Sequence, residues 1–212
     1  MENHKRIYKD EIGADKTHIH LMVNLKCTNK CRDCCNLQYD LTSVPVVAVE
    51  ELKQADTVMI TGGEPFAMKG LLGFLRSLRH QYKNIRRLYV YTSGAAMYLT
   101  KDYWMSKEFA ILVDGINFSP KGYFDEYCIR DLFSNRTFCG YMKDIPENRF
   151  ILIDYFGKQT NDDEFIKSLH LENACYAQSN LCKQYKIEQR KFQQEFQPNG
   201  GVWRRLPIFM DN

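Results

Sequence analysis

Short apolar runs rich in β-branched residues alternate along this chain with amphipathic stretches, and this alternation restricts the fold more than any other feature. The pattern is typical of repeated βα units that build a mainly parallel sheet. Leu71, Leu72, Leu75 and Leu78 recur at the spacing of one helix face. The sequence therefore predicts an α/β fold. Its five visible strands comprise residues 20–25, 57–61, 87–92, 110–118 and 149–155.

The last third of the chain divides less clearly into strands and helices. Asn161, followed by three acidic residues, predicts a capped helix start, because acidic side chains favour the first turn. Residues 183–196 have helical character, and residues 202–209 form an apolar tail that we expect to close or cap the sheet. The expected organisation is an N-terminal extension (1–17), a main α/β unit (18–182), and a C-terminal helix and tail (183–212).

Composition limits the class of protein without choosing a partner. Of the 212 residues 44% are hydrophobic, which is enough to bury one compact core. No apolar run approaches the roughly 20 residues of a membrane span, and residues 1–16 lack an apolar signal segment, so we expect a cytoplasmic protein without a membrane partner. The 29 basic and 26 acidic residues nearly balance, and this gives no clear signal for nucleic acid.

Four of the eight cysteines fall within nine residues, directly after the first predicted strand. Cys27, Cys31 and Cys34 have the spacing C-x3-C-x2-C. Three thiolates on a loop can hold three irons of a four-iron cluster and leave the fourth iron open to an external ligand. A zinc site prefers four closed protein ligands, and here it would recruit Cys35 or one of two nearby histidines, His18 and His20. Both kinds of site are compatible with the loop by itself.

A second motif, Thr61-Gly62-Gly63-Glu64-Pro65, follows the predicted strand 57–61. It lies at the carboxyl end of that strand, where parallel α/β folds place their binding sites. Glycines allow the backbone to approach a ligand closely, and a glutamate can accept hydrogen bonds from an ammonium group. We therefore expect this segment to bind a ligand beside the cysteine loop.

The two motifs, in this order and at these strand ends, resemble those of the radical S-adenosylmethionine (SAM) superfamily. The resemblance implies an incomplete (β/α)6 partial TIM barrel in which a 4Fe-4S cluster reductively cleaves SAM to a 5'-deoxyadenosyl radical that abstracts hydrogen. It also implies an electron donor such as flavodoxin or ferredoxin. By this resemblance the cluster ligands are Cys27, Cys31 and Cys34, and the residues that meet the SAM amino group are Gly62, Gly63 and Glu64.

Two further strand ends extend the resemblance to the 7-carboxy-7-deazaguanine synthase family. Thr92-Ser93-Gly94 and Ser119-Pro120-Lys121 follow the predicted strands 87–92 and 110–118, although such residues are also ordinary in turns. The similarity implies that Thr92, Ser93, Ser119 and Lys121 contact SAM and that the substrate is a small molecule, such as a deazapurine or nucleoside precursor. That family binds magnesium through a threonine, whose place Cys35 and Asn36 take here, so a magnesium ion would lack this ligand.

Other functions remain open from the sequence. One alternative is a glycyl-radical activase or peptide-modifying enzyme that acts on a partner protein, and another is a non-catalytic zinc or iron-sulfur module. The remaining cysteines could form an auxiliary cluster or be free thiols; they are Cys128, Cys139, Cys175 and Cys182. Arg204 and Arg205 could clamp a carboxylate or phosphate, or could lie on a solvated surface. No residue is assigned as a catalytic group.

Overall fold

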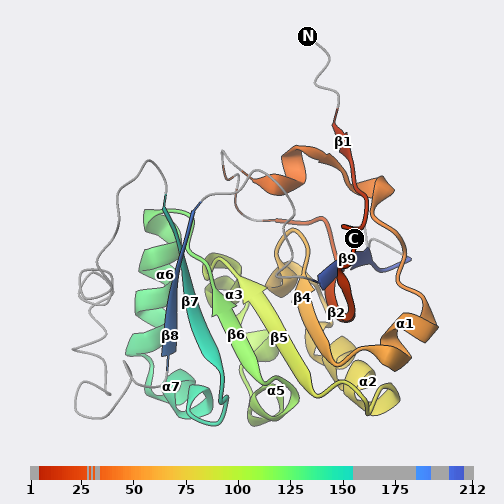
Figure 1. Ribbon diagram of the computed structural model, residues 1–212. Helices are drawn as coiled ribbons and strands as arrows, with labels where there is room; N and C mark the ends of the chain where they lie inside the picture. Colours follow the sequence, from red (N-terminus) through yellow and green to blue (C-terminus); the bar gives the residue numbers. More distant parts are fainter. Residues whose placement is uncertain are drawn as a thin grey trace.

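A seven-stranded, entirely parallel sheet organises the computed structural model, which describes residues 5–27, 29, 31, 34–154, 185–191 and 201–207 (Figure 1). The strand order is β8-β7-β6-β5-β4-β2-β9, so six strands succeed one another in chain order and β9 is added at the far edge. The strands are β2 (Asp15–Met22), β4 (Thr57–Thr61), β5 (Arg87–Thr92), β6 (Gly115–Phe118), β7 (Asn148–Asp154), β8 (Tyr185–Lys191) and β9 (Gly201–Arg205).

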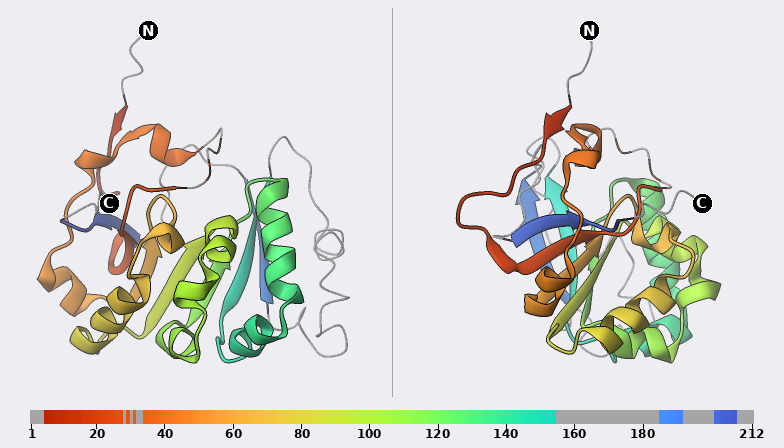
Figure 2. Two further views of the ribbon diagram at one scale, coloured as in Figure 1. Left: turned by 180° about the vertical axis from the view of Figure 1, so that it is seen from behind. Right: turned by 90° about the vertical axis from the view of Figure 1, so that its right-hand side faces the viewer.

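The helices lie mainly on one face of this sheet (Figure 2). A separate pair of short strands, β1 (Arg6–Ile7) and β3 (Tyr39–Asp40), joins the N-terminal segment to the chain beyond the cysteine loop. No helix in the described ranges is long and apolar enough to cross a membrane. The helices are α1 (Val49–Gln54), α2 (Leu71–Gln81), α3 (Ala95–Leu99), α4 (Lys101–Trp104), α5 (Lys107–Leu112), α6 (Tyr123–Ser134) and α7 (Arg136–Met142), with short 3-10 turns η1 (Cys35–Leu37), η2 (Leu41–Ser43) and η3 (Pro65–Ala67).

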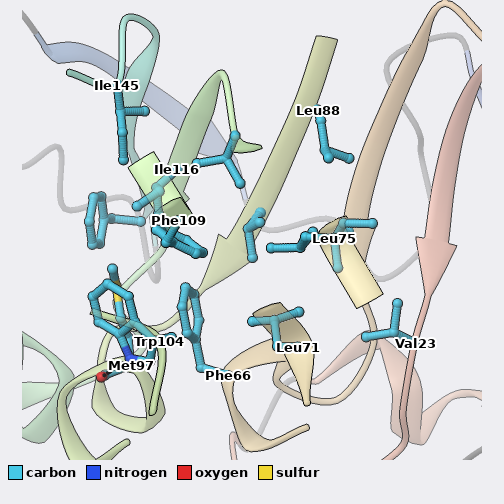
Figure 3. Close-up of a cluster of buried hydrophobic side chains, with 14 of the residues drawn as sticks. Val23, Phe66, Leu71, Leu75, Leu88, Met97, Trp104, Phe109, Ile116 and Ile145 are labelled. Carbon is cyan, nitrogen blue, oxygen red and sulfur yellow. Dashed lines mark hydrogen bonds between the residues drawn. The ribbon is translucent and has the colours of Figure 1, made fainter. Parts of the chain in front are cut away.

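Every second side chain of the central strands points toward the helices and contributes to the core. Ile19, Leu21, Val58 and Ile60 point from their strands toward the helices and are fully buried. On the helix side, Figure 3 shows Leu71 and Leu75 of α2 within the same cluster as Phe66, Trp104 and Phe109. The Trp104 ring meets both Phe66 and Phe109 edge-on at centroid distances of 5.1 Å. This core fixes the sheet, and the sheet fixes the loops at its carboxyl edge.

The parallel α/β class is confirmed, whereas two predicted elements are wrong. Residues 110–118 are not one strand, because Ser106 caps α5 by accepting a hydrogen bond from the Phe109 N–H at 3.2 Å, and β6 starts only at Gly115. Residues 185–191 form β8 instead of the predicted helix, since all seven residues pair in parallel with β7. The predicted helix start at Asn161 lies outside the described residues.

The apolar tail joins the sheet as β9 and is anchored by a buried arginine. Arg204 donates to both carboxylate oxygens of Asp10 at 2.8 and 2.9 Å and to Glu51 at 2.7 Å. The hydrogen bonds from Arg204 hold the pKa of Asp10 below its usual range. Arg205 donates to the carbonyl of Val44. Both sequence-based interpretations of Arg204 are therefore wrong: it is neither a ligand clamp nor a solvated surface residue, but joins the two ends of the chain.

Candidate functional site

The residues predicted to bind a cofactor come together at the carboxyl ends of four adjacent strands. The cysteine loop follows β2, and Gly62-Gly63-Glu64 follows β4. Thr92 and Ser93 lie at the end of β5, and the segment from Ser119 to Lys121 follows β6. Since β2, β4, β5 and β6 are neighbours in the sheet, one edge gathers segments that span almost a hundred residues of sequence (Figure 1).

The two glycines allow the segment after β4 to lie directly against the cysteine loop. The Gly63 N–H donates to the Asn24 carbonyl at 2.9 Å, and the Glu64 N–H donates to the Lys26 carbonyl at 2.7 Å. A Cβ atom on Gly62, whose φ is +144°, would lie 2.5 Å from the Asn24 oxygen, and one on Gly63 would lie 2.2 Å from the Lys26 oxygen. The close approach shown here is thus to the cysteine loop, whereas the sequence predicted an approach to a ligand.

Glu64 is a buried acceptor, with only 2% of its surface exposed. Its side chain caps η3 by accepting from the Phe66 N–H at 3.4 Å, and its other oxygen accepts from the Ser93 N–H at 2.9 Å. Burial raises the pKa of Glu64 to about 7, although hydrogen bonds from Ser93, Thr92 and Phe66 oppose that rise. A cation placed beside this carboxylate would favour its ionised form.

Asn29, in the middle of the cysteine loop, links the loop to β5 and α6. Its amide nitrogen donates to the Ser93 hydroxyl at 3.0 Å and to the two carboxylate oxygens of Asp125 at 2.7 and 2.9 Å. The Lys121 N–H donates to the same Asp125 carboxylate at 2.9 Å, and the Lys121 ammonium donates to the Ser119 hydroxyl at 2.8 Å. Hydrogen bonds therefore connect Glu64, Ser93, the cysteine loop and the Ser119–Lys121 segment in one network.

Asn29 and Asp125 were not identified from the sequence. Asp125 does carry a signal, because it occupies the buried stripe of α6 that continues with Cys128, Ile129 and Leu132. A charged residue at an apolar helix position requires a partner, and the residues of the cysteine loop supply one. Asn29 carries no comparable signal, since asparagine is common in loops.

The three motif cysteines differ in exposure. Cys27 is exposed, whereas Cys31 and Cys34 are half-buried, and the Cys34 N–H donates to the Cys31 carbonyl at 3.3 Å. Burial, with a smaller contribution from neighbouring Cys34, raises the pKa of Cys31 to about 11, while Lys121 opposes that rise. Although residue Cys27 is exposed overall, partial desolvation of its thiol also raises the pKa of Cys27. Within the described part of the chain, no three His, Cys, Asp or Glu side chains are arranged as a ready-made metal site.

Of the four cysteines that could form an auxiliary cluster, the structure describes Cys128 and Cys139. Cys128 and Cys139 are buried in α6 and α7, and the Cys139 thiol donates to the Phe133 carbonyl at 3.1 Å. Cys175 and Cys182 lie outside the described residues. For Cys128 and Cys139, the contacts observed are those of buried thiols in a hydrophobic core.

Aromatic side chains occupy the face of the sheet opposite the helices. The His20 ring stacks on His18 and Trp203, with centroid distances of 5.2 and 4.8 Å, and lies 6.3 Å from Tyr91. Burial lowers the pKa of His18, which favours the neutral imidazole. Nearby on this face, the Asn117 side-chain oxygen is buried and accepts no hydrogen bond within the described part of the molecule. This face therefore presents stacked rings, together with the Asn117 side-chain oxygen and the His18 Nε2, both buried and without a hydrogen-bond partner among the described residues.

No protein-family model and no curated protein sequence matches this chain. What the site binds is therefore inferred from its own side chains and their geometry.

Proposed function

We propose that this protein is a radical SAM enzyme whose cluster and SAM bind at the carboxyl ends of β2, β4, β5 and β6. One observation carries this proposal: the N–H groups of Gly63 and Glu64 donate to the backbone carbonyls of Asn24 and Lys26 in the cysteine loop. The cluster and SAM must contact each other, so they require adjacent binding segments, and these two segments are adjacent. The chain-order succession of six strands is compatible with an incomplete (β/α)6 barrel.

The donor set fits an iron-sulfur cluster in its chemistry. Cys27, Cys31 and Cys34 are soft thiol ligands. Cys34 contributes to the raised pKa values of both Cys27 and Cys31, so the three thiols lie near one another. Three protein ligands leave one iron open. When bound, the cluster would supply the single electron that breaks a sulfonium carbon–sulfur bond of SAM, giving methionine and a 5'-deoxyadenosyl radical.

The side chains around the loop would hold the methionine part of SAM. Glu64 would accept hydrogen bonds from the SAM ammonium, and that positive charge would offset the cost of keeping a carboxylate buried. Ser119 and Lys121 would donate to the SAM carboxylate, because their side chains already meet at 2.8 Å. Thr92 and Ser93 orient Glu64 through hydrogen bonds. Both charges of the amino acid moiety would thereby find partners of opposite sign.

We propose that the substrate is a small molecule bound over the face that carries His18, His20, Trp203, Tyr91 and Asn117. Stacked aromatic rings accept a planar group, and a buried amide oxygen without a partner favours a ligand that donates a hydrogen bond. A deazapurine or nucleoside precursor has both properties. A flavodoxin or ferredoxin would supply the electron, as expected for a cytoplasmic enzyme of this class.

A second candidate, an activase or peptide-modifying enzyme that acts on a partner protein, is favoured by one observation. Tyr123, Phe124 and Tyr127 are exposed on the first two turns of α6, and Tyr123 has 91% of its surface exposed. These rings lie close in sequence to Lys121 and Asp125 of the site. Aromatic residues are enriched in protein interfaces, so stable co-purification of a partner protein would favour this candidate over a small-molecule substrate.

Anaerobic reconstitution with iron and sulfide tests the cofactor assignment. After reduction with dithionite, we expect an electron paramagnetic resonance signal that changes when SAM is added. In Glu64→Gln the signal should form but respond weakly to SAM, because the variant cannot offer a charged acceptor. A protein that stays colourless and takes up only zinc would refute the proposal.

A further inference from the structure

Asp125 is a buried carboxylate that the proposed chemistry does not use. It lies in the first turn of α6 with 3% of its surface exposed, among apolar residues of the same helix face. Asp and Glu are almost never buried to this extent unless they are paired. The hydrogen-bond partners of Asp125 therefore indicate its role.

Its partners come from two different loops. Asn29 donates to both of its oxygens at 2.7 and 2.9 Å across 96 residues of sequence, and the Lys121 N–H donates at 2.9 Å. Asn29 lies midway between Cys27 and Cys31, so it occupies the centre of the cysteine motif. Through Asn29, a helix on one side of the sheet holds the loop that follows β2.

We infer that Asp125 is a positioning residue that fastens the cysteine loop to the strand ends through the Asn29 amide. Hydrogen bonds to a charged acceptor are stronger than neutral ones, and both oxygens of this acceptor engage the Asn29 amide. A loop already held in place loses less conformational freedom when it binds metal. The consequence for cluster loading rests on the proposed function, whereas the contact between Asp125 and Asn29 does not.

The contact can be tested without any cofactor. Lys30 and Arg32 lie within the motif, so trypsin cleavage of the iron-free protein, mapped by mass spectrometry, reports how firmly the loop is held. Asp125→Ala should speed cleavage there by about tenfold, the effect of losing one charge-assisted hydrogen bond. Glu126→Ala, which removes the next acidic residue of the same helix turn, should leave the rate unchanged.

A swapped pair separates the contact from a general loss of stability. Asn29→Asp alone places two carboxylates together and should loosen the loop, whereas Asn29→Asp combined with Asp125→Asn restores an amide–carboxylate pair in reverse. We expect the double variant to recover protection from trypsin. Because this comparison uses conservative changes, it remains decisive even where Asp125→Ala fails to fold.

Iron retention against a chelator then links the contact to the proposed function. If the reconstituted wild type holds iron, Asp125→Ala should lose it about tenfold faster, and the swapped pair should hold it. Equal trypsin cleavage and equal iron loss in wild type and Asp125→Ala would overturn the inference while leaving the cluster assignment intact. Faster cleavage in Asp125→Ala, together with a wild type that takes up no iron, would support the contact and refute the proposed function.

Discussion

Glu64→Gln should stabilise the cofactor-free protein near pH 8 while weakening its response to SAM. The free carboxyl group has an ordinary pKa of 4.5, and burial raises it to about 7 in the folded chain. Between these two pH values the folded state binds more protons than the unfolded state, so stability falls as pH rises. At about 1.4 kcal/mol for each pH unit, the ionised carboxylate costs up to about 3 kcal/mol above pH 7.

Urea unfolding of wild type and Glu64→Gln, from about pH 4 to about pH 8, measures this cost directly. The difference between the two proteins cancels the titration of other groups, such as His18, whose pKa burial lowers. We expect a small difference near pH 4 that grows in favour of the variant up to about pH 7 and then levels off. Glu126→Gln, which makes the same chemical change on α6 outside the Glu64 hydrogen bonds, is the matched control. A difference that does not grow in favour of Glu64→Gln between about pH 4 and about pH 7 would show that the carboxylate is not destabilised by burial.

Three further predictions concern the loop, the glycines and the chain ends. Gly63→Ala should cost about 2 kcal/mol in urea unfolding and impair iron loading, because its Cβ would meet the Lys26 oxygen; Gly73→Ala, with open space around it, should gain about 1 kcal/mol. Arg204→Met should cost about 3 to 5 kcal/mol by removing the cation that Asp10 and Glu51 share, and a smaller loss would mean that water and their remaining donors, Tyr8 and the Ala48 N–H, suffice. Cys34→Ala should abolish iron binding in reconstitution, whereas Cys35→Ala should retain it; iron loss in both variants would show that the ligand register is wrong.

Buried strands were predictable because their residues are apolar in a short run bounded by turns. The bounds of β4 and β5 were predicted correctly, and β7 is shifted by a single residue at each end, whereas β2 runs from Asp15 to Met22 instead of over the predicted residues 20–25. The predicted strand 110–118 was wrong because a run of apolar residues does not distinguish a buried helix from a strand. The cap by Ser106 favours the helix over the first part of this stretch. In β8, pairing with β7 overrides the helical propensity of the segment, which no local pattern could reveal.

The candidate site was predictable where chemistry is confined to short motifs at strand ends. Parallel strands bring their carboxyl ends to one edge, so the cysteine loop, Glu64, Ser93 and Lys121 were expected to lie close together, and hydrogen bonds through Asn29 and Asp125 connect them. The role of Asn29 could not be predicted, because its partner is 96 residues away and depends on how α6 packs. The role of the glycines was predicted only in part, since the neighbour that requires them is the cysteine loop itself.

The central proposal is that this site cleaves SAM, and product analysis tests it most directly. Protein reconstituted anaerobically with iron and sulfide is reduced with dithionite in the presence of SAM, and 5'-deoxyadenosine is quantified by chromatography beside a Cys34→Ala control. We predict that the wild type forms 5'-deoxyadenosine and that the control forms none. Intact SAM in a wild-type protein that carries a full iron-sulfur cluster would contradict the proposal.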